Sequence, residues 1–159
     1  MKRLVLPLLL FLLPVAAPAA AVPAMPTLPA VTLTSLAGTT VSLDDLGTAA
    51  NVVLVLVRKG ESAGERLLAF LEGLDGLPPE RLAIVVGGAD GAIVSAIAGR
   101  HSGVAASWYP DPDGEVAKEL QLRATPVTIG ARNGIVVWKV IGLHDEETMR
   151  KTLLGWGTR

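Results

Sequence analysis

A short charged segment carries the side chains best suited to chemistry. It reads Arg58-Lys59-Gly60-Glu61-Ser62-Ala63-Gly64-Glu65-Arg66. If a helix begins here, its first N–H groups together with Arg58 and Lys59 could bind an anion or the carboxylate of a partner. A solvated loop in which Glu61 is favoured by the helix dipole explains the same residues without a binding site. Both interpretations remain open at this point.

Ser62 is the nucleophilic hydroxyl of this segment. A catalytic serine needs a base within hydrogen-bond reach and donors for an oxyanion. The sequence gives no reason for the two histidines, His101 and His144, to lie beside it. Helix capping is therefore the favoured role, with Ser62 as the N-cap and Glu65 completing a capping box. The two histidines are also not spaced as a metal-binding pair.

The chain contains no cysteine. Thiol nucleophiles, disulfides and thiolate-bound zinc or iron–sulfur sites are therefore excluded. The glycine-rich residues 87–91 follow an expected strand but lack both the phosphate-binding Lys-Ser/Thr pair and the Gly-x-Gly-x-x-Gly spacing. We therefore expect neither a metal nor a cofactor.

The N-terminus predicts export. Lys2 and Arg3 precede an apolar run from Leu4 to Val15, and small residues with an Ala-x-Ala pattern follow. This is the order of a secretory signal peptide. The run has 12 residues, whereas a membrane-spanning helix needs roughly 20, so an uncleaved anchor is the weaker alternative. We expect a signal peptide at 1–21, an extended proline-rich leader at 22–30 and one domain at 31–159. The expected location is periplasmic or secreted, with no stable membrane span after cleavage.

Charge argues against nucleic acid as a partner. The signal peptide holds two of the 14 basic residues and none of the 15 acidic ones, which leaves the mature chain with a net charge near −3. Nucleic-acid binding typically requires a basic patch.

The remaining residues predict an α/β domain. Runs without a polar residue at 52–57 and 82–86 indicate interior strands covered on both faces. Helical spacing begins at Ser62, and further helices are expected between Asp90 and Gly99, after the turn at 110–114, and from Asp145. Hairpins are expected at 31–43 and, around Asn133-Gly134, at 127–140. The pattern predicts a central mixed β-sheet flanked by helices, with an N-terminal β-hairpin extension.

Four segments between Thr32 and Leu154 resemble segments of the thioredoxin superfamily and occur in the same order along the chain. The resemblance is strongest to its periplasmic redoxin branch, the TlpA-like thiol–disulfide oxidoreductases. The segments are Leu36–Leu46, the strand Val52–Val57 with its loop and helix, Tyr109–Ala117, and Arg123–Val136. The last match is partial, because Val127 replaces a threonine and the hairpin lacks the usual aspartate. The resemblance implies a thioredoxin-like fold.

The same resemblance locates a degenerate active site. In the family, a Trp-Cys-x-x-Cys sequence follows the central strand, and here Glu61 and Gly64 fall near the two cysteine positions. Neither can form a mixed disulfide, so the thiol–disulfide activity is absent. The resemblance also implies a cis peptide bond at Thr125–Pro126, beside which the family binds extended peptides.

We therefore expect a non-catalytic binding or accessory module whose partner is a protein or extended peptide of the cell envelope. Its expected binding face comprises Arg58, Lys59, Gly60, Glu61, Ser62, Gly64, Thr125 and Pro126. An enzyme with non-thiol chemistry at the same loop is the alternative, so enzymatic activity stays undecided. A purely structural domain is the third possibility.

Overall fold

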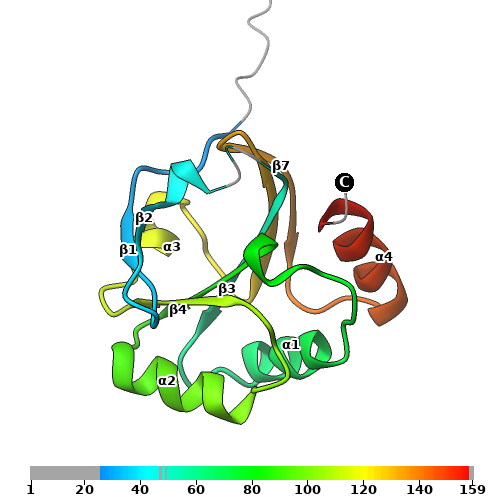
Figure 1. The fold of residues 1–159 in the computed structure, drawn as a ribbon, viewed down its shortest axis with the longest axis horizontal. Helices are drawn as coiled ribbons and strands as arrows, with labels where there is room; N and C mark the ends of the chain where they lie inside the picture. Colours follow the sequence, from blue (N-terminus) through cyan, green and yellow to red (C-terminus); the bar gives the residue numbers. More distant parts are fainter. Residues whose placement is uncertain (1–25, 47, 49, 158–159) are drawn as a thin grey trace, which may run out of the picture.

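The computed structural model describes residues 26–46, 48 and 50–157, and Figure 1 shows their fold. The expected signal peptide at 1–21 lies outside the described residues. A five-stranded sheet forms the centre, in the order β5 (Ser107–Asp111), β4 (Leu82–Gly87), β3 (Val52–Arg58), β6 (Val127–Arg132) and β7 (Ile135–Ile141). β4 runs parallel to β3 and β5, whereas β6 runs antiparallel to β3 and β7. The sheet is therefore mixed, as predicted.

The central position of β3 follows from its composition. Residues 52–57 are all buried, because they alternate between the two faces of the sheet and both faces are covered. On one face Val53, Val55 and Val57 join the helix-side core, and on the other Leu54 and Leu56 join the hairpin-side core.

Two different layers cover the sheet. The helix-side core lies under α1 (Ser62–Glu72), α2 (Gly91–Arg100) and α4 (Glu146–Gly157). The hairpin-side core lies under a second, two-stranded sheet and α3 (Glu115–Glu119). In that small sheet, β1 (Thr32–Thr34) pairs with β2 (Thr40–Ser42). A 3₁₀ turn, η1 (Leu43–Asp45), follows β2, and a second 3₁₀ turn, η2 (Pro79–Arg81), precedes β4. Figure 1 shows the hairpin and α3 on the side of the sheet away from α1, α2 and α4.

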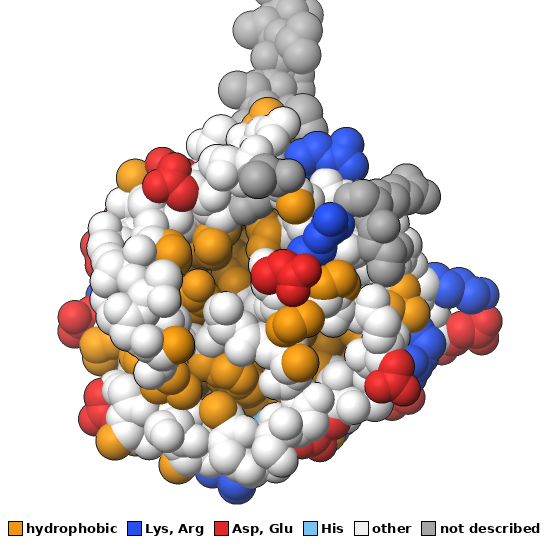
Figure 2. Space-filling view, in the orientation of Figure 1, with side chains coloured by type: hydrophobic (Ala, Val, Ile, Leu, Met, Phe, Trp, Pro, Cys, Tyr) orange, Lys and Arg blue, Asp and Glu red, His pale blue; other side chains and the backbone are white. Residues whose placement is uncertain are grey.

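The hairpin covers its face of the sheet incompletely. Figure 2 shows hydrophobic side chains in a hollow between the hairpin and the sheet. Leu36, in the hairpin turn, is 40% exposed. Among the described residues, no helix has the length and apolar character required to cross a membrane.

One strand was absent from the sequence-based prediction. Residues 107–111 form β5, although the sequence predicted a turn from Pro110 onward. β5 is an edge strand of the sheet, and a proline is tolerated there because it need not donate to a neighbour. Trp108 and Tyr109 are 7% and 4% exposed, so they belong to the two cores and form no binding surface.

The described end of the expected leader packs against the domain. Thr27 forms an antiparallel bridge with Ile135, and the N–H of Val136 donates to the carbonyl of Pro26 at 2.8 Å. Leu28 is 3% exposed and lies in the hairpin-side core. These residues are extended and cover the start of the outer edge of β7.

Thr128 gives a prediction about stability. It is fully buried in β6, and its Oγ1 has no hydrogen-bond partner within the described part of the chain. An unpaired buried hydroxyl costs about 1–3 kcal/mol. Thr128→Val has nearly the same shape without the hydroxyl, so we expect it to raise the free energy of unfolding by about 1 kcal/mol in urea titration. Thr152→Val is the control, because the Thr152 hydroxyl donates to the Thr148 carbonyl. A less stable Thr128→Val variant would contradict the expectation.

Candidate functional site

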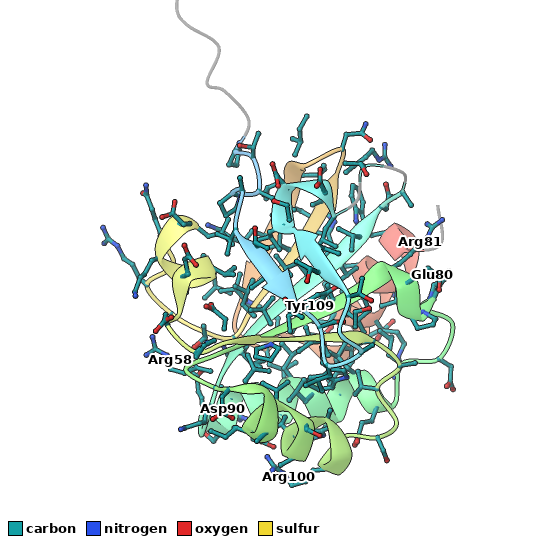
Figure 3. All side chains as sticks on the ribbon, turned by 60° about the vertical axis from the view of Figure 1, so that its left-hand side comes forward. Arg58, Glu80, Arg81, Asp90, Arg100 and Tyr109 are labelled. Carbon is teal, nitrogen blue, oxygen red and sulfur yellow. The ribbon has the colours of Figure 1, made fainter. Side chains whose placement is uncertain are left out.

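A groove opens where β3, β4 and β5 end. It consists of two adjoining cavities of about 240 and 280 Å³. Arg58, Ala117 and Thr125 line both cavities, so the two form one surface, here called the Arg58 groove. The first cavity is also lined by Leu56, Val57 and Val85 and by the loops at 87–88 and 111–114. The second cavity is also lined by Glu61 and residues 122–124. Figure 3 shows Arg58 at the end of its strand, near α3 and Asp90 and far from Glu80 and Arg81.

The loop after β3 sets the position of Glu61. The N–H of Lys59 donates to the carbonyl of Gly87 at 3.1 Å, which ties the loop to the end of β4. Gly60 then has a φ of +77°, a conformation that glycine adopts without a steric penalty. The N–H of Glu61 donates back to the Arg58 carbonyl, and Glu61 becomes the N-cap residue of α1.

Glu61 lies beside the cis-proline. Thr125 Oγ1 donates to Glu61 Oε2 at 2.5 Å, although the two residues are 64 positions apart. The Thr125–Pro126 peptide bond is cis, and Pro126 is buried. The structure thus joins the two parts of the expected site that lie far apart in the sequence.

The expected capping box is wrong. Ser62 is the first residue of α1 and is exposed; the N-cap is Glu61, and its side chain makes no capping hydrogen bond. Glu65 points to α2 instead: Arg100 donates to its Oε1 and His101 Nε2 to its Oε2, both at 2.9 Å. The contacts of Glu65 with another helix outweigh the local capping pattern. Sequence periodicity alone does not predict such contacts.

The Glu65 contacts predict a dependence of stability on pH. The hydrogen bond from His101, then Arg100, lowers the pKa of the Glu65 carboxyl below its usual 4.5, against an opposing effect of burial. A carboxyl with a lowered folded pKa contributes stability above its unfolded pKa and loses it as the pH falls through the folded pKa. Glu65→Gln should therefore lower the melting temperature at pH 7, and the difference from the wild type should shrink below pH 4.5. Glu80→Gln, at an exposed position in η2, is the control. A difference that stays constant down to pH 3 would contradict this account.

The other predicted residues lie around the groove without lining it. Lys59, Gly60 and Ser62 are exposed and are absent from both cavity walls. Gly64 is buried where α1 crosses β3, and a Cβ there would lie 3.2 Å from Val57 Cβ. Its role is close packing of the helix on the sheet.

Of the residues that line the groove, only Arg58, Glu61 and Thr125 were expected. The others are residues 56–57, 85, 87–88, 111–114, 117 and 122–124. A signal existed, since β3, β4 and β5 are parallel and the carboxyl ends of parallel strands meet at one edge of a sheet. Without β5 in the predicted sheet, that edge was incomplete.

The groove carries an excess of positive charge around its second cavity. Arg58 and Arg123 are exposed, and within the described residues their guanidinium groups have no hydrogen bond or ion pair. The carboxylate of Glu61 is engaged by Thr125. At the first cavity, Asp111 is buried and accepts the N–H groups of Glu115 and Val116 at 2.8 and 3.1 Å, so it caps α3.

The geometry gives no support to hydrolytic chemistry in the groove. His101 bonds Glu65, and His144 Nε2 lies 2.8 Å from the Ile141 carbonyl; neither histidine lines a groove cavity. Among the described residues, no group of three or more His, Asp and Glu side chains is placed to hold a metal ion.

Comparison with solved structures establishes the fold. The chain superposes on "MTB dsbF" with a TM-score of 0.69 and 14% identity, covering 84% of this chain and 99% of the other. It superposes on a secreted Mycobacterium tuberculosis disulfide oxidoreductase homologous to E. coli DsbE with a TM-score of 0.67 and 13% identity, covering 79% and 96%. The exposed lipoprotein thioredoxin Etrx1 of Streptococcus pneumoniae gives 0.61 and 18%, covering 77% and 96%.

No protein-family model matches the chain, and no curated protein matches it. The solved neighbours are thioredoxins and thiol–disulfide oxidoreductases, and this chain has their fold without a cysteine. The thioredoxin-like fold predicted from the sequence is confirmed.

Proposed function

We propose that this protein is an exported, non-catalytic binding module that holds an extended polypeptide of the cell envelope in the Arg58 groove. The fold places the groove beside a cis-proline at the start of α1, and no thiol can act there. A surface of this kind can bind a polypeptide without covalent exchange.

The contact between Thr125 and Glu61 carries the proposal. A carboxylate stands at the N-cap of α1, where the resemblance places the first cysteine, and a hydroxyl next to Pro126 holds it at 2.5 Å. The contact fixes the loop against β6 while cavities stay open next to it. A rigid, open groove suits recognition, because little conformational freedom is lost when a ligand binds.

Photo-crosslinking tests the binding site. A photoreactive residue at Ala124, on the wall of the second cavity, leaves the Glu61–Thr125 contact intact. A matched residue at Glu147, exposed on α4, is the control. With reduced, carboxymethylated α-lactalbumin as a soluble unfolded chain, we expect a crosslink from position 124 only. Equal crosslinking from both positions, or none from 124, would refute a polypeptide-binding groove.

Export is part of the proposal and has its own test. It is supported by the basic, apolar and small residues of the first 21 positions, and by structural neighbours described as secreted or as an exposed lipoprotein. Expression of the full chain in a bacterial host, followed by fractionation, should give a periplasmic protein whose N-terminal sequence starts at Ala20 or Val22. A protein that keeps Lys2 and Arg3 and stays in the cytoplasm would refute export.

A further inference from the structure

Resting on the proposed function, we infer that the Arg58 groove selects an extended segment that carries an apolar side chain and, two residues away, an aspartate or glutamate. The apolar side chain enters the first cavity, over Leu56 and Val85. The carboxylate enters the second, between Arg58 and Arg123.

The first cavity fits one apolar side chain. The side chains of Leu56 and Val85, which line it, belong to the hairpin-side core and are at most 3% exposed, so this part of the lining is apolar. A volume of about 240 Å³ is below the ~300–1,000 Å³ of pockets that hold drug-sized molecules. Glycines at 87, 88 and 114 line the entrance and add no side chain that would fill it. Burial of a Val, Leu or Ile side chain here is favourable, because it removes apolar surface from water.

The second cavity fits a carboxylate. Two guanidinium groups, those of Arg58 and Arg123, border it against one carboxylate, that of Glu61, so its lining carries a net positive charge. The one acidic group there, Glu61, already accepts from Thr125. Arginine binds carboxylates through two parallel N–H donors, which adds geometric specificity to charge attraction.

Charge also fixes the orientation. Asp111 and Asp113 line the first cavity and not the second. Asp111 is occupied in capping α3, and Lys118 Nζ bonds the backbone carbonyl of Asp113, which leaves the Asp113 carboxylate unneutralised. A carboxylate is therefore repelled from the first cavity and attracted to the second.

The spacing follows from the shared wall. Arg58, Ala117 and Thr125 line both cavities, so the two cavities adjoin along one groove. In an extended chain, residues i and i+2 point to the same side and are roughly 6–7 Å apart, whereas i and i+1 point to opposite sides. The two recognised side chains therefore belong to positions i and i+2.

Fluorescence anisotropy with short peptides tests the inference. The probe is a labelled, N-acetylated and C-amidated nonapeptide of Ser and Gly that carries Leu at position 4 and Glu at position 6. Three matched peptides replace Glu by Gln, replace Leu by Ser, or place Leu and Glu next to each other. We expect the dissociation constant of each of these three to be at least tenfold higher than that of the probe. Binding of the probe itself should weaken strongly between 50 and 300 mM salt, and binding of the Gln peptide should not.

Variants of the protein assign the two cavities. Arg58→Gln combined with Arg123→Gln should bind the Glu and Gln peptides equally. Gly87→Val should bind the Leu and Ser peptides equally, because the added side chain narrows the first cavity, and its Cβ makes only an ordinary 3.7 Å contact with the Val57 carbonyl. Arg66→Gln, exposed on α1 outside the groove, is the control and should keep both preferences. Melting curves show whether each variant is folded.

The outcomes separate this inference from the proposed function. If the Ala124 crosslink to the unfolded chain persists but the wild type binds all four peptides equally, the selectivity is refuted and the binding groove stands. If the crosslink also fails, the binding function itself is refuted. The peptide series on the wild type is decisive even where a variant does not fold.

Discussion

The double substitution Glu61→Cys with Gly64→Cys is expected to give this chain a reducible disulfide and a thiol of lowered pKa. Position 61 is the N-cap of α1, and position 64 is three residues on, inside the first turn of the helix. A thiolate at a helix N-terminus is stabilised by the aligned peptide dipoles, which can lower its pKa from about 8.5 to between 3.5 and 7.5. Thiol titration against pH, and reduction of an insulin disulfide, measure the two effects; the unsubstituted chain should show neither.

The control for this experiment keeps the spacing and removes the helix start. Ser95→Cys with Ala98→Cys places two cysteines three residues apart in the middle of α2. Those thiols should keep an ordinary pKa. A Cβ at Gly64 lies 3.2 Å from Val57 Cβ, so the double variant should also melt at a lower temperature. The single Glu61→Cys variant avoids that contact, and an ordinary pKa for its thiol would contradict the placement of the site.

Gly130→Ala is expected to destabilise the fold strongly. Gly130 in β6 pairs with Trp138 in β7, and a Cβ at this position would overlap the indole ring of Trp138. The ring cannot easily move, because it packs edge-on against Trp156 at a centroid distance of 6.1 Å, and Trp156 Nε1 donates to the Val52 carbonyl. Overpacking of this kind costs about 2–3 kcal/mol. We expect the melting temperature to fall by roughly 8–15 °C.

Two further variants show that the loss comes from this contact. Gly99→Ala is the matched control: Gly99 is in α2, and a Cβ there meets nothing within 4 Å. It should raise stability by about 0.5–1 kcal/mol, because alanine is the better helix former. Adding Trp138→Leu to Gly130→Ala should restore part of the lost stability. A Gly130→Ala protein as stable as the wild type would show that Trp138 is free to move.

Sequence composition by itself determined the central part of the fold. β3 and β4 are runs of apolar residues too uniform for an exposed strand, and they lie in the middle of the sheet. α1 follows from the spacing of its buried residues, and α2 lies in the segment where a helix was expected, with Asp90 as its N-cap. The absence of cysteine also excludes thiol chemistry, whatever the fold. These features depend on residues close together in the chain, which is why a local pattern predicts them.

Only the tertiary structure decided what surrounds that core. The strand β5 depends on its place at the sheet edge, where Pro110 costs no hydrogen bond. Glu65 bonds His101, 36 residues away, and not the helix start that its spacing suggested. The groove likewise assembles from strand ends, α3 and the residues before Pro126, which meet only after the sheet forms. Contacts of this kind leave no periodic signal in the sequence, because their energy comes from groups that the chain brings together from distant positions.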